Sequence, residues 1–325
     1  MTNFNYLKLY FEKRMLRIFL LGIISGFPWV LIGSALSLWL KESDLSRSTI
    51  GWAGLIFGVY AINFLWAPLV DRLKIPILTD KIGHRKSWIL SMQFIILLSL
   101  IFWSFLDPSK NLWLIIAAGL GIAISSATQD ITIDALRIEQ IGQNEGRSIA
   151  AGAAISVVGW WTGYKIGGVI SLVSAEFLQK KGIENYWQYS FLILTSIIIF
   201  CSIALLLIPE KNSDKKYDAQ KIADKKILEK LGNPNRINII IAWLSGTVIN
   251  PLISFFKKNS VNVALGILSF VFLFKIGEAF LGRMSIIFYK EIGFSKSDIA
   301  IYSKSLGWIT TVIFTLLGGL FVIRS

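Results

Sequence analysis

The chain has 325 residues, of which 54% are hydrophobic and 16% are charged, and its formal net charge at pH 7 is +13. A soluble domain would carry about 25% charged residues, so this composition excludes a large soluble core. The positive charge is typical of the Lys and Arg excess in cytoplasmic loops of membrane proteins, and we do not interpret it as a nucleic-acid surface. A single Cys and a single His, Cys201 and His84, exclude an intrachain disulfide and leave little for a metal site.

Apolar runs follow one another along the chain, and each is long enough to cross a bilayer core of about 30 Å. They predict eight membrane-spanning helices, at 18–39, 50–70, 88–106, 112–133, 149–174, 187–208, 262–282 and 304–323. The first run is too long for a signal peptide and is predicted to be a retained span. The sequence therefore predicts an all-α, polytopic transmembrane bundle.

A long link separates the sixth and seventh predicted spans and divides the chain into 1–208, 209–261 and 262–325. The link begins with a charged run at 211–230. Its later part, 237–256, is apolar enough to be a ninth span. The Asn, Ser and Pro residues within this part, and the two lysines after it, favour an interfacial helix on the cytoplasmic leaflet.

The distribution of basic residues predicts the orientation. With the N-terminus inside, 22 of the 33 Lys and Arg residues lie in cytoplasmic segments and 9 lie in external loops, which include 283–304. This bias predicts a cytoplasmic N-terminus.

The first span contains the run Gly26-Phe27-Pro28 near its middle. Proline removes a backbone hydrogen bond and can kink a helix, so we expect the helix to be weakened here. A kinked span can hinge or line a cavity, whereas the alternative for the glycines is ordinary close packing.

Charged residues inside spans are candidates for function, because each costs about 2.5–3.5 kcal/mol at mid-membrane. Lys275 and Glu278 lie three residues apart in the seventh span and can pair on one helix face. Such a pair is either structural or part of a proton or substrate site. Lys165 in the fifth span either snorkels to an interface or lines a cavity for an anionic or sugar-like substrate.

Two carboxylates lie near the cytoplasmic end of the fourth span, after Gln129. Asp130 and Asp134 are four residues apart and share one helix face. Arg137, three residues after Asp134, can neutralise it in a surface ion pair. Asp130 lies deeper, and we expect it to be the functional carboxylate.

The loop after the second span contains Asp71-Arg72 and then a basic run, Gly83-His84-Arg85-Lys86. An acidic residue at a helix end beside a basic cluster can form a charge lock between neighbouring helices. Basic cytoplasmic loops are common, so the pattern alone is weak.

This loop resembles the signature of the major facilitator superfamily, and further runs resemble its AmpG family of muropeptide permeases. These runs lie at 64–69, 126–131, 151–157, 274–280 and 304–307, in the family's order. The run at 126–131, Ser-Ala-Thr-Gln-Asp-Ile, is the most specific.

The resemblance implies proton-driven import of N-acetylglucosaminyl-1,6-anhydro-N-acetylmuramic acid, with or without its peptide, across the bacterial inner membrane for cell-wall recycling. Alternating access between two helical bundles is expected. The predicted substrate and proton pathway comprises Gln129, Asp130, Lys165, Lys275, Glu278 and Lys304. The predicted conformational gate comprises Asp71, Arg72, Arg85, Lys86 and Asp134. We expect no metal or cofactor, a proton as coupling ion, and the lipid bilayer and the solute as partners.

The sequence also departs from the family pattern. Asn63 replaces the usual Lys before the run at 64–69, and Trp160-Trp161 replace Tyr-Arg in the fifth span, where Lys165 is a candidate substitute. Members of the superfamily have twelve or more spans, so we expect a shortened permease that does not transport without the missing helices. The alternative is a non-transporting remnant, or a subunit that needs a second chain. The scattered carboxylates and the absence of a nucleophile motif argue against a membrane enzyme.

Overall fold

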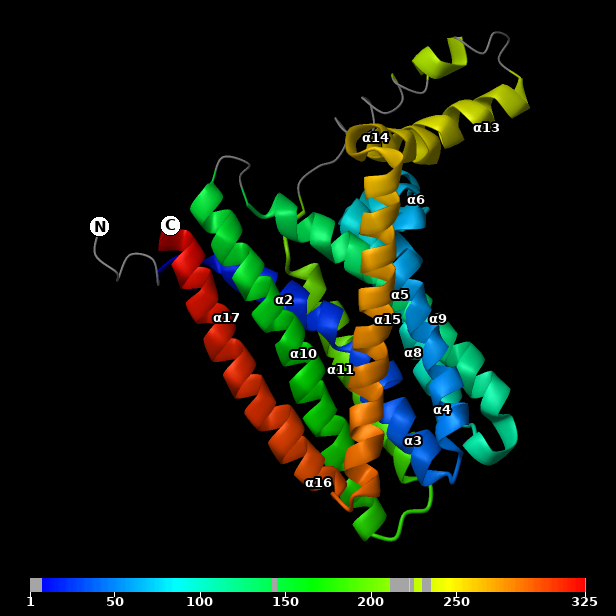
Figure 1. Ribbon diagram of the computed structural model, residues 1–325, viewed down its shortest axis with the longest axis vertical. Coiled ribbons are helices and arrows are strands. Elements are labelled where there is room, and N and C mark those ends of the chain that lie inside the picture. The colour runs from blue at the N-terminus through cyan, green and yellow to red at the C-terminus, as the bar shows by residue number, and fades with distance from the viewer. Residues whose placement is uncertain (1–7, 142–144, 211–221, 223–224, 230–234, 325) are drawn as a thin grey trace.

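The computed structural model describes residues 8–141, 145–210, 222, 225–229 and 235–324, and these residues form helices and no strands. Long helices lie side by side in one bundle (Figure 1). Seven of them are long and apolar enough to cross a membrane. The predicted all-α, polytopic fold is confirmed.

The first span is interrupted where the sequence predicts a weak point. Helix α2 (Lys13–Gly26) ends directly before Phe27, and a π-helical segment, η1 (Val30–Ala35), connects it to α3 (Leu36–Glu42). The wider π-helical turn follows Pro28, which has no N–H to donate to the preceding turn. The interruption lies in the buried core, where it shapes the face that the first span presents to its neighbours.

The second span was predicted as one run but is a succession of short helical pieces. They are α4 (Arg47–Ala53), η2 (Gly54–Gly58), α5 (Val59–Ile62), η3 (Asn63–Leu65) and α6 (Ala67–Arg72). Glycine has a low helix propensity, and the glycines at 51, 54 and 58 together with Pro68 explain why this span departs from a regular α-helix. The short α7 (Leu78–Ile82) follows in the loop.

The next four helices, the second of which is kinked at Asn111, complete a six-helix unit. They are α8 (His84–Trp103), α9 (Pro108–Glu139), α10 (Gly146–Lys180) and α11 (Tyr186–Leu206). Helix α10 is not among the seven apolar helices because Gly, Ser, Trp and Tyr lower its hydropathy. It is nevertheless 35 residues long and packs against α2, α11 and α17, at the place of the predicted fifth span.

Glycines bring α2 and α10 into backbone contact. A Cβ on Gly22 would lie 2.6 Å from the carbonyl oxygen of Ser156 and 2.9 Å from the Cα of Gly159. Gly163 likewise leaves no room for a side chain against the backbone of Ile23. Close packing is therefore the role of these glycines.

The link after α11 is only partly described, since residues 211–221, 223–224 and 230–234 lie outside the described residues. Its later part forms α13 (Arg236–Leu244), η4 (Ser245–Ile249) and α14 (Asn250–Asn259). These helices run across the end of α15 and do not lie along the bundle (Figure 1). This arrangement is compatible with an interfacial helix, and its position in the membrane remains a prediction.

The last two spans are longer than predicted. Helix α15 extends over Val261–Glu291, and α16 (Lys296–Asp298), η5 (Ile299–Leu306) and α17 (Gly307–Arg324) form the final span. The assignment of Arg283 to an external loop was therefore wrong: it lies inside α15, because the apolar run continues past it to Ile287.

The final helices contact different parts of the six-helix unit. Helix α17 packs along α10, whereas α15 packs against η1, α3, η2 and α5. Figure 1 shows α15 and α17 meeting near α16 and diverging toward their other ends. Each also carries a broad exposed apolar face, with Phe270 and Leu281 on α15 and Phe314 and Phe321 on α17.

Candidate functional site

An aromatic strip lies on the six-helix unit where α15 and η5 approach it. The Trp29 ring is 4.9 Å from that of Phe57, 4.7 Å from that of Tyr60 and 5.4 Å from that of Trp160, and Trp160 is 5.6 Å from Tyr164, between ring centroids. The indole N–H of Trp29 and the hydroxyl of Tyr60 are buried without a hydrogen-bond partner among the described residues. Such rings can stack on sugars, and the two polar groups can bind hydroxyls.

Two lysines lie at the η5 end of the aromatic strip. The Lys304 side chain is 1% exposed, and its Nζ lies 4.0 Å above the ring centroid of Tyr164. Lys165 Nζ donates to the carbonyl oxygen of Ser303 at 2.9 Å and lies within electrostatic range of Lys304. The structure thus brings together two cations that the sequence placed in the substrate pathway, with no carboxylate paired to either among the described residues.

Asp130 lies near the same strip. Its Oδ1 accepts a 2.6 Å hydrogen bond from Ser25 Oγ, and its carboxylate is in electrostatic range of Tyr60. The neighbouring Gln129 is buried, and its Nε2 donates to the carbonyl oxygen of Ile24 at 2.9 Å. These bonds join α9 to α2 at the level of the interrupted first span.

Lys275 and Glu278 form the predicted ion pair on α15, at 2.9 Å. The two side chains are 42% and 46% exposed, and whether the pair serves structure or transport stays a prediction. Lys275 is also in electrostatic range of Asp130 on α9. Two predicted pathway residues, Asp130 of the six-helix unit and Lys275 of α15, are thus within electrostatic range of each other.

An ionic cluster occupies the bundle end that contains α6 and α7. Arg85 is 3% exposed and binds Asp71 at 2.5 Å and Glu139 at 3.5 Å. Glu210 accepts hydrogen bonds from the backbone N–H groups of Arg85 at 2.7 Å and Lys86 at 3.0 Å. A carboxylate at a helix N-terminus is favourable, and here it ties the end of α11 to the start of α8.

The cluster includes some predicted gate residues but not all of them in the predicted way. Lys86 donates only its backbone N–H, to Glu210, and Arg72 is the last residue of α6, directly after Asp71. Asp134 is 64% exposed and pairs with Arg137 on its own helix at 3.0 Å, so it forms the surface ion pair that the sequence offered as an alternative. Its predicted role in the conformational gate stays a prediction.

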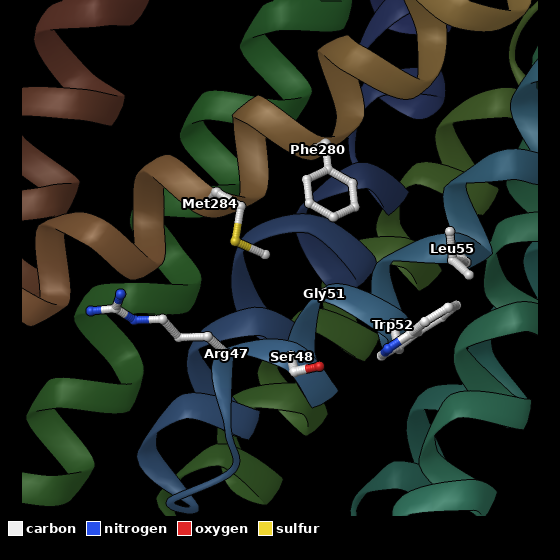
Figure 2. A pocket seen from close by; sticks show the side chains of 7 residues that line it. All are labelled: Arg47, Ser48, Gly51, Trp52, Leu55, Phe280 and Met284. Atoms are coloured by element: carbon white, nitrogen blue, oxygen red, sulfur yellow. The ribbon is translucent and has the colours of Figure 1, made fainter.

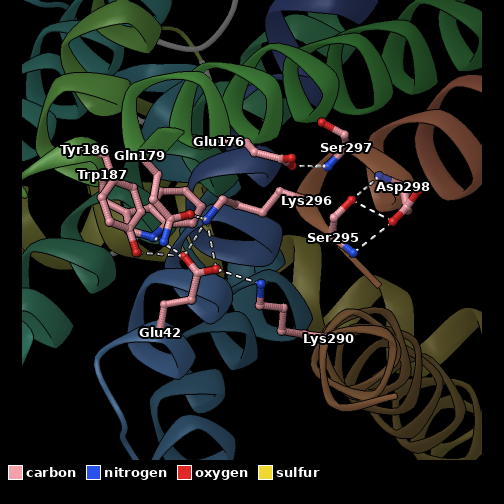
Figure 3. Close-up of polar contacts among 10 residues, drawn as sticks. All are labelled: Glu42, Glu176, Gln179, Tyr186, Trp187, Lys290, Ser295, Lys296, Ser297 and Asp298. Carbon is pink, nitrogen blue, oxygen red and sulfur yellow. Dashed lines mark hydrogen bonds and ion pairs between the residues drawn. The ribbon is translucent and has the colours of Figure 1, made fainter. Parts of the chain in front are cut away.

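A second ionic cluster at the opposite end connects the six-helix unit with α15 and α16 (Figure 3). The Glu42 carboxylate, at the end of α3, lies 3.0 Å from Lys290 Nζ and 2.9 Å from Lys296 Nζ. It also accepts hydrogen bonds from the Tyr186 hydroxyl at 3.1 Å and the Trp187 indole N–H at 2.8 Å.

Further bonds around this Glu42 cluster also join the six-helix unit to α15 and α16. Lys296 is 2% exposed and also donates to Gln179 Oε1 at 2.7 Å, while Glu176 accepts from the backbone N–H of Ser297 at 2.5 Å (Figure 3). Glu291 on α15 pairs with Lys41 and Arg47 at 3.1 and 2.6 Å. Sequence reasoning missed this cluster, because its members are up to 254 residues apart.

A pocket of 420 Å³ lies between α4 and α15 (Figure 2). Gly51, Trp52 and Leu55 line one side, and Phe280 and Met284 line the other. Trp52 is 71% exposed, so the pocket opens to the outer face of the bundle. None of the predicted site residues lines it, and its lining is apolar apart from Arg47 and Ser48.

Comparisons with known proteins establish the family. Residues 18–324 match the description "Major Facilitator Superfamily". The chain belongs to the Major Facilitator Superfamily.

Within this superfamily the chain is AmpG-like. It is 35% identical to the "Putative transporter AmpG 4" of Rickettsia conorii, over 98% of this chain and 69% of that protein. It is 31% identical to the "Anhydromuropeptide permease" of Escherichia coli, over 98% of this chain and 57% of that protein, and 31% identical to the "Putative transporter AmpG 1" of Rickettsia prowazekii, over 93% and 70%. These relatives confirm the resemblance and indicate a multi-pass membrane transporter.

Proposed function

We propose that the chain, contrary to the expectation that it is inactive without further helices, imports an anhydromuropeptide, a sugar-containing anion, across the bacterial inner membrane by alternating access driven by protons. The observation that carries the proposal is the aromatic strip from Phe57 to Tyr164, with unpartnered polar groups along it and the cations Lys165 and Lys304 at one end. The name of the Escherichia coli relative supports this choice of solute.

Each part of the site has a distinct role in this proposal. The rings of Trp29, Trp160 and Tyr164 stack on the sugar units, and Lys165 and Lys304 donate hydrogen bonds to sugar oxygen atoms and, where a stem peptide is present, bind its carboxylate. Asp130, held by Ser25 beside the strip, takes up the coupling proton. Protonation removes its charge and changes its attraction to Lys275 on α15, which links proton binding to the position of that helix.

The two ionic clusters act as gates in this proposal. The Glu42 cluster bridges the six-helix unit and α15–α16, so it closes the end that the basic-residue bias places outside. The Arg85 cluster lies at the cytoplasmic end and joins helices within the six-helix unit. Opening of the outer end requires the bonds of Glu42 to break.

A second candidate is a subunit that transports only together with another chain. The exposed apolar faces of α15 and α17 favour it, because each can pack against further helices as well as against lipid.

Uptake and binding together test the proposal. Permease-deficient cells that express the chain are assayed for uptake of labelled N-acetylglucosaminyl-1,6-anhydro-N-acetylmuramic acid, and the purified chain is assayed for binding. Uptake that a protonophore abolishes supports import by this chain. Binding without uptake supports the two-chain alternative, and loss of both refutes the muropeptide assignment.

A further inference from the structure

Arg283 on α15 is a buried cation with an incomplete set of partners. It is 3% exposed, and its Nε donates to Ser37 Oγ at 3.0 Å. Its Nη1 and Nη2 have no hydrogen-bond partner among the described residues. Guanidinium groups carry five donors, and a buried charge without a counter-ion is costly, so this arrangement requires an explanation.

The other four charged residues of α15 are all paired. Lys275 binds Glu278, Lys290 binds Glu42, and Glu291 binds Lys41 and Arg47. Arg283 is the exception within the described residues, and no described carboxylate lies within ion-pair distance of it. A counter-ion from outside the chain would complete the pattern.

The space around Arg283 is shaped to hold a guanidinium group. A Cβ on Gly54 would lie 2.5 Å from Arg283 Nη1, so the glycine leaves room that any side chain would fill. The guanidinium carbon lies 5.4 Å from the ring centroid of Phe57, the first ring of the aromatic strip. Arg283 therefore marks the α15 end of the strip, and Lys304 marks its η5 end.

We propose that Arg283 binds a carboxylate of the transported sugar when α15 separates from α3 and η2. This inference rests on the proposed function, since it assigns an anion subsite to the same strip. The planar fork of a guanidinium matches a carboxylate with two parallel hydrogen bonds, which Nη1 and Nη2 have free to donate. In the closed interface these donors are covered, so the sugar acid binds once the interface opens.

The position of Arg283 also connects binding with the outer gate. Lys290 lies seven residues, or about 10 Å, further along the same helix and on the same face. The unpaired Arg283 disfavours the closed interface, whereas the bonds of Lys290 to Glu42 favour it. The closed state leaves the Arg283 charge uncompensated. An anionic solute neutralises this charge in the open state, and its binding therefore favours opening.

The test compares two sugars that differ in a carboxylate. Purified chain in nanodiscs is titrated with N-acetylmuramic acid and with N-acetylglucosamine, and binding is followed by tryptophan fluorescence and thermal unfolding. Arg283→Met should weaken binding of the sugar acid by about tenfold or more, as expected for a lost charged hydrogen bond, and leave the neutral sugar within about twofold. It should also raise the Tm without ligand.

Two further variants keep the test decisive. Arg283→Lys, which retains the charge but loses the fork, should show an intermediate loss and serves if the Met variant does not fold. Lys110→Met is the control, because this lysine is 80% exposed, pairs with the neighbouring Asp107 and belongs to neither ionic cluster. It should bind both sugars as the wild type does.

The outcomes separate this inference from the proposed function. If wild type prefers the sugar acid and Arg283→Met keeps that preference, the Arg283 subsite is refuted while the function stands. If wild type binds neither sugar, the proposed function fails, and succinate then probes Arg283 without a sugar. Succinate stabilisation that Arg283→Met abolishes supports the anion site, and its absence in wild type overturns it.

Discussion

Replacement of Glu42 by Gln should open the end of the bundle that contains α3 and α16. Glu42 is 9% exposed and joins Lys290 and Lys296, and Lys296 itself is 2% exposed. Removal of one partner from a buried ion pair costs about 3–5 kcal/mol. Glutamine retains one acceptor oxygen, and Lys296 keeps its bond to Gln179, so we expect the lower figure of about 3 kcal/mol. That energy shifts the closed-to-open equilibrium by about 100-fold.

The opening can be measured as a distance. Cysteines introduced at Lys181 and Ile292, in a background without Cys201, carry the spin labels. Double electron–electron resonance then measures the distance between the end of α10 and the α15–α16 loop. Glu42→Gln should populate longer distances. The double variant Glu42→Gln/Lys296→Met should recover the closed distance, because no deeply buried cation is then left unpaired, and the remaining Lys290 is 29% exposed and can be solvated.

Glu291→Gln is the matched control for this experiment. Glu291 also links α15 to the six-helix unit, but one of its partners, Arg47, is 72% exposed, so water readily replaces the pair. We expect a much smaller change in the distances. Equal opening by both variants, or unchanged distances in Glu42→Gln, would refute the role of the Glu42 cluster as a gate.

Three further predictions concern the site, the packing and the orientation. Asp130→Asn should abolish uptake of labelled anhydromuropeptide, whereas Asp134→Asn should retain part of it, because Asp134 is an exposed, locally paired residue; equal tolerance would remove Asp130 from the site. Gly22→Ala should lower the free energy of unfolding by about 1–3 kcal/mol, because the added Cβ meets the backbone of α10. Gly266→Ala should be neutral, because a Cβ there meets nothing within 4 Å. Equal Tm values for the two variants would contradict the close packing of α2 and α10. A cysteine at position 225 should not react with a membrane-impermeant thiol reagent in intact cells, because this segment is predicted to be cytoplasmic. Labelling from outside would show that the orientation is the reverse of the predicted one.

Features that depend on local spacing could be predicted from the sequence. Apolar runs located the spans, Pro28 located the break in the first span, and the spacing of Lys275 and Glu278 predicted their ion pair. The depth difference between Asp130 and Asp134 also followed from position along one helix. The ion pair and the helix break each depend on residues within about one helical turn.

The clusters that join distant helices could not be predicted. Glu42 and Lys296 are 254 residues apart, and no spacing rule connects them. Glu139 and Glu210 join Arg85 only because three helices end at the same level. Arg283 was missed for another reason: the predicted span ended one residue before it, so a buried charge was counted as a loop charge.

Equilibrium binding of labelled N-acetylglucosaminyl-1,6-anhydro-N-acetylmuramic acid to the purified chain tests the muropeptide site most directly. We expect saturable binding to the wild type. It should weaken about tenfold or more in Lys304→Met, which removes the buried cation over Tyr164, and remain unchanged in Lys181→Met, which removes an exposed one. No saturable binding, or equal binding by wild type and Lys304→Met, would contradict the placement of the muropeptide on the aromatic strip.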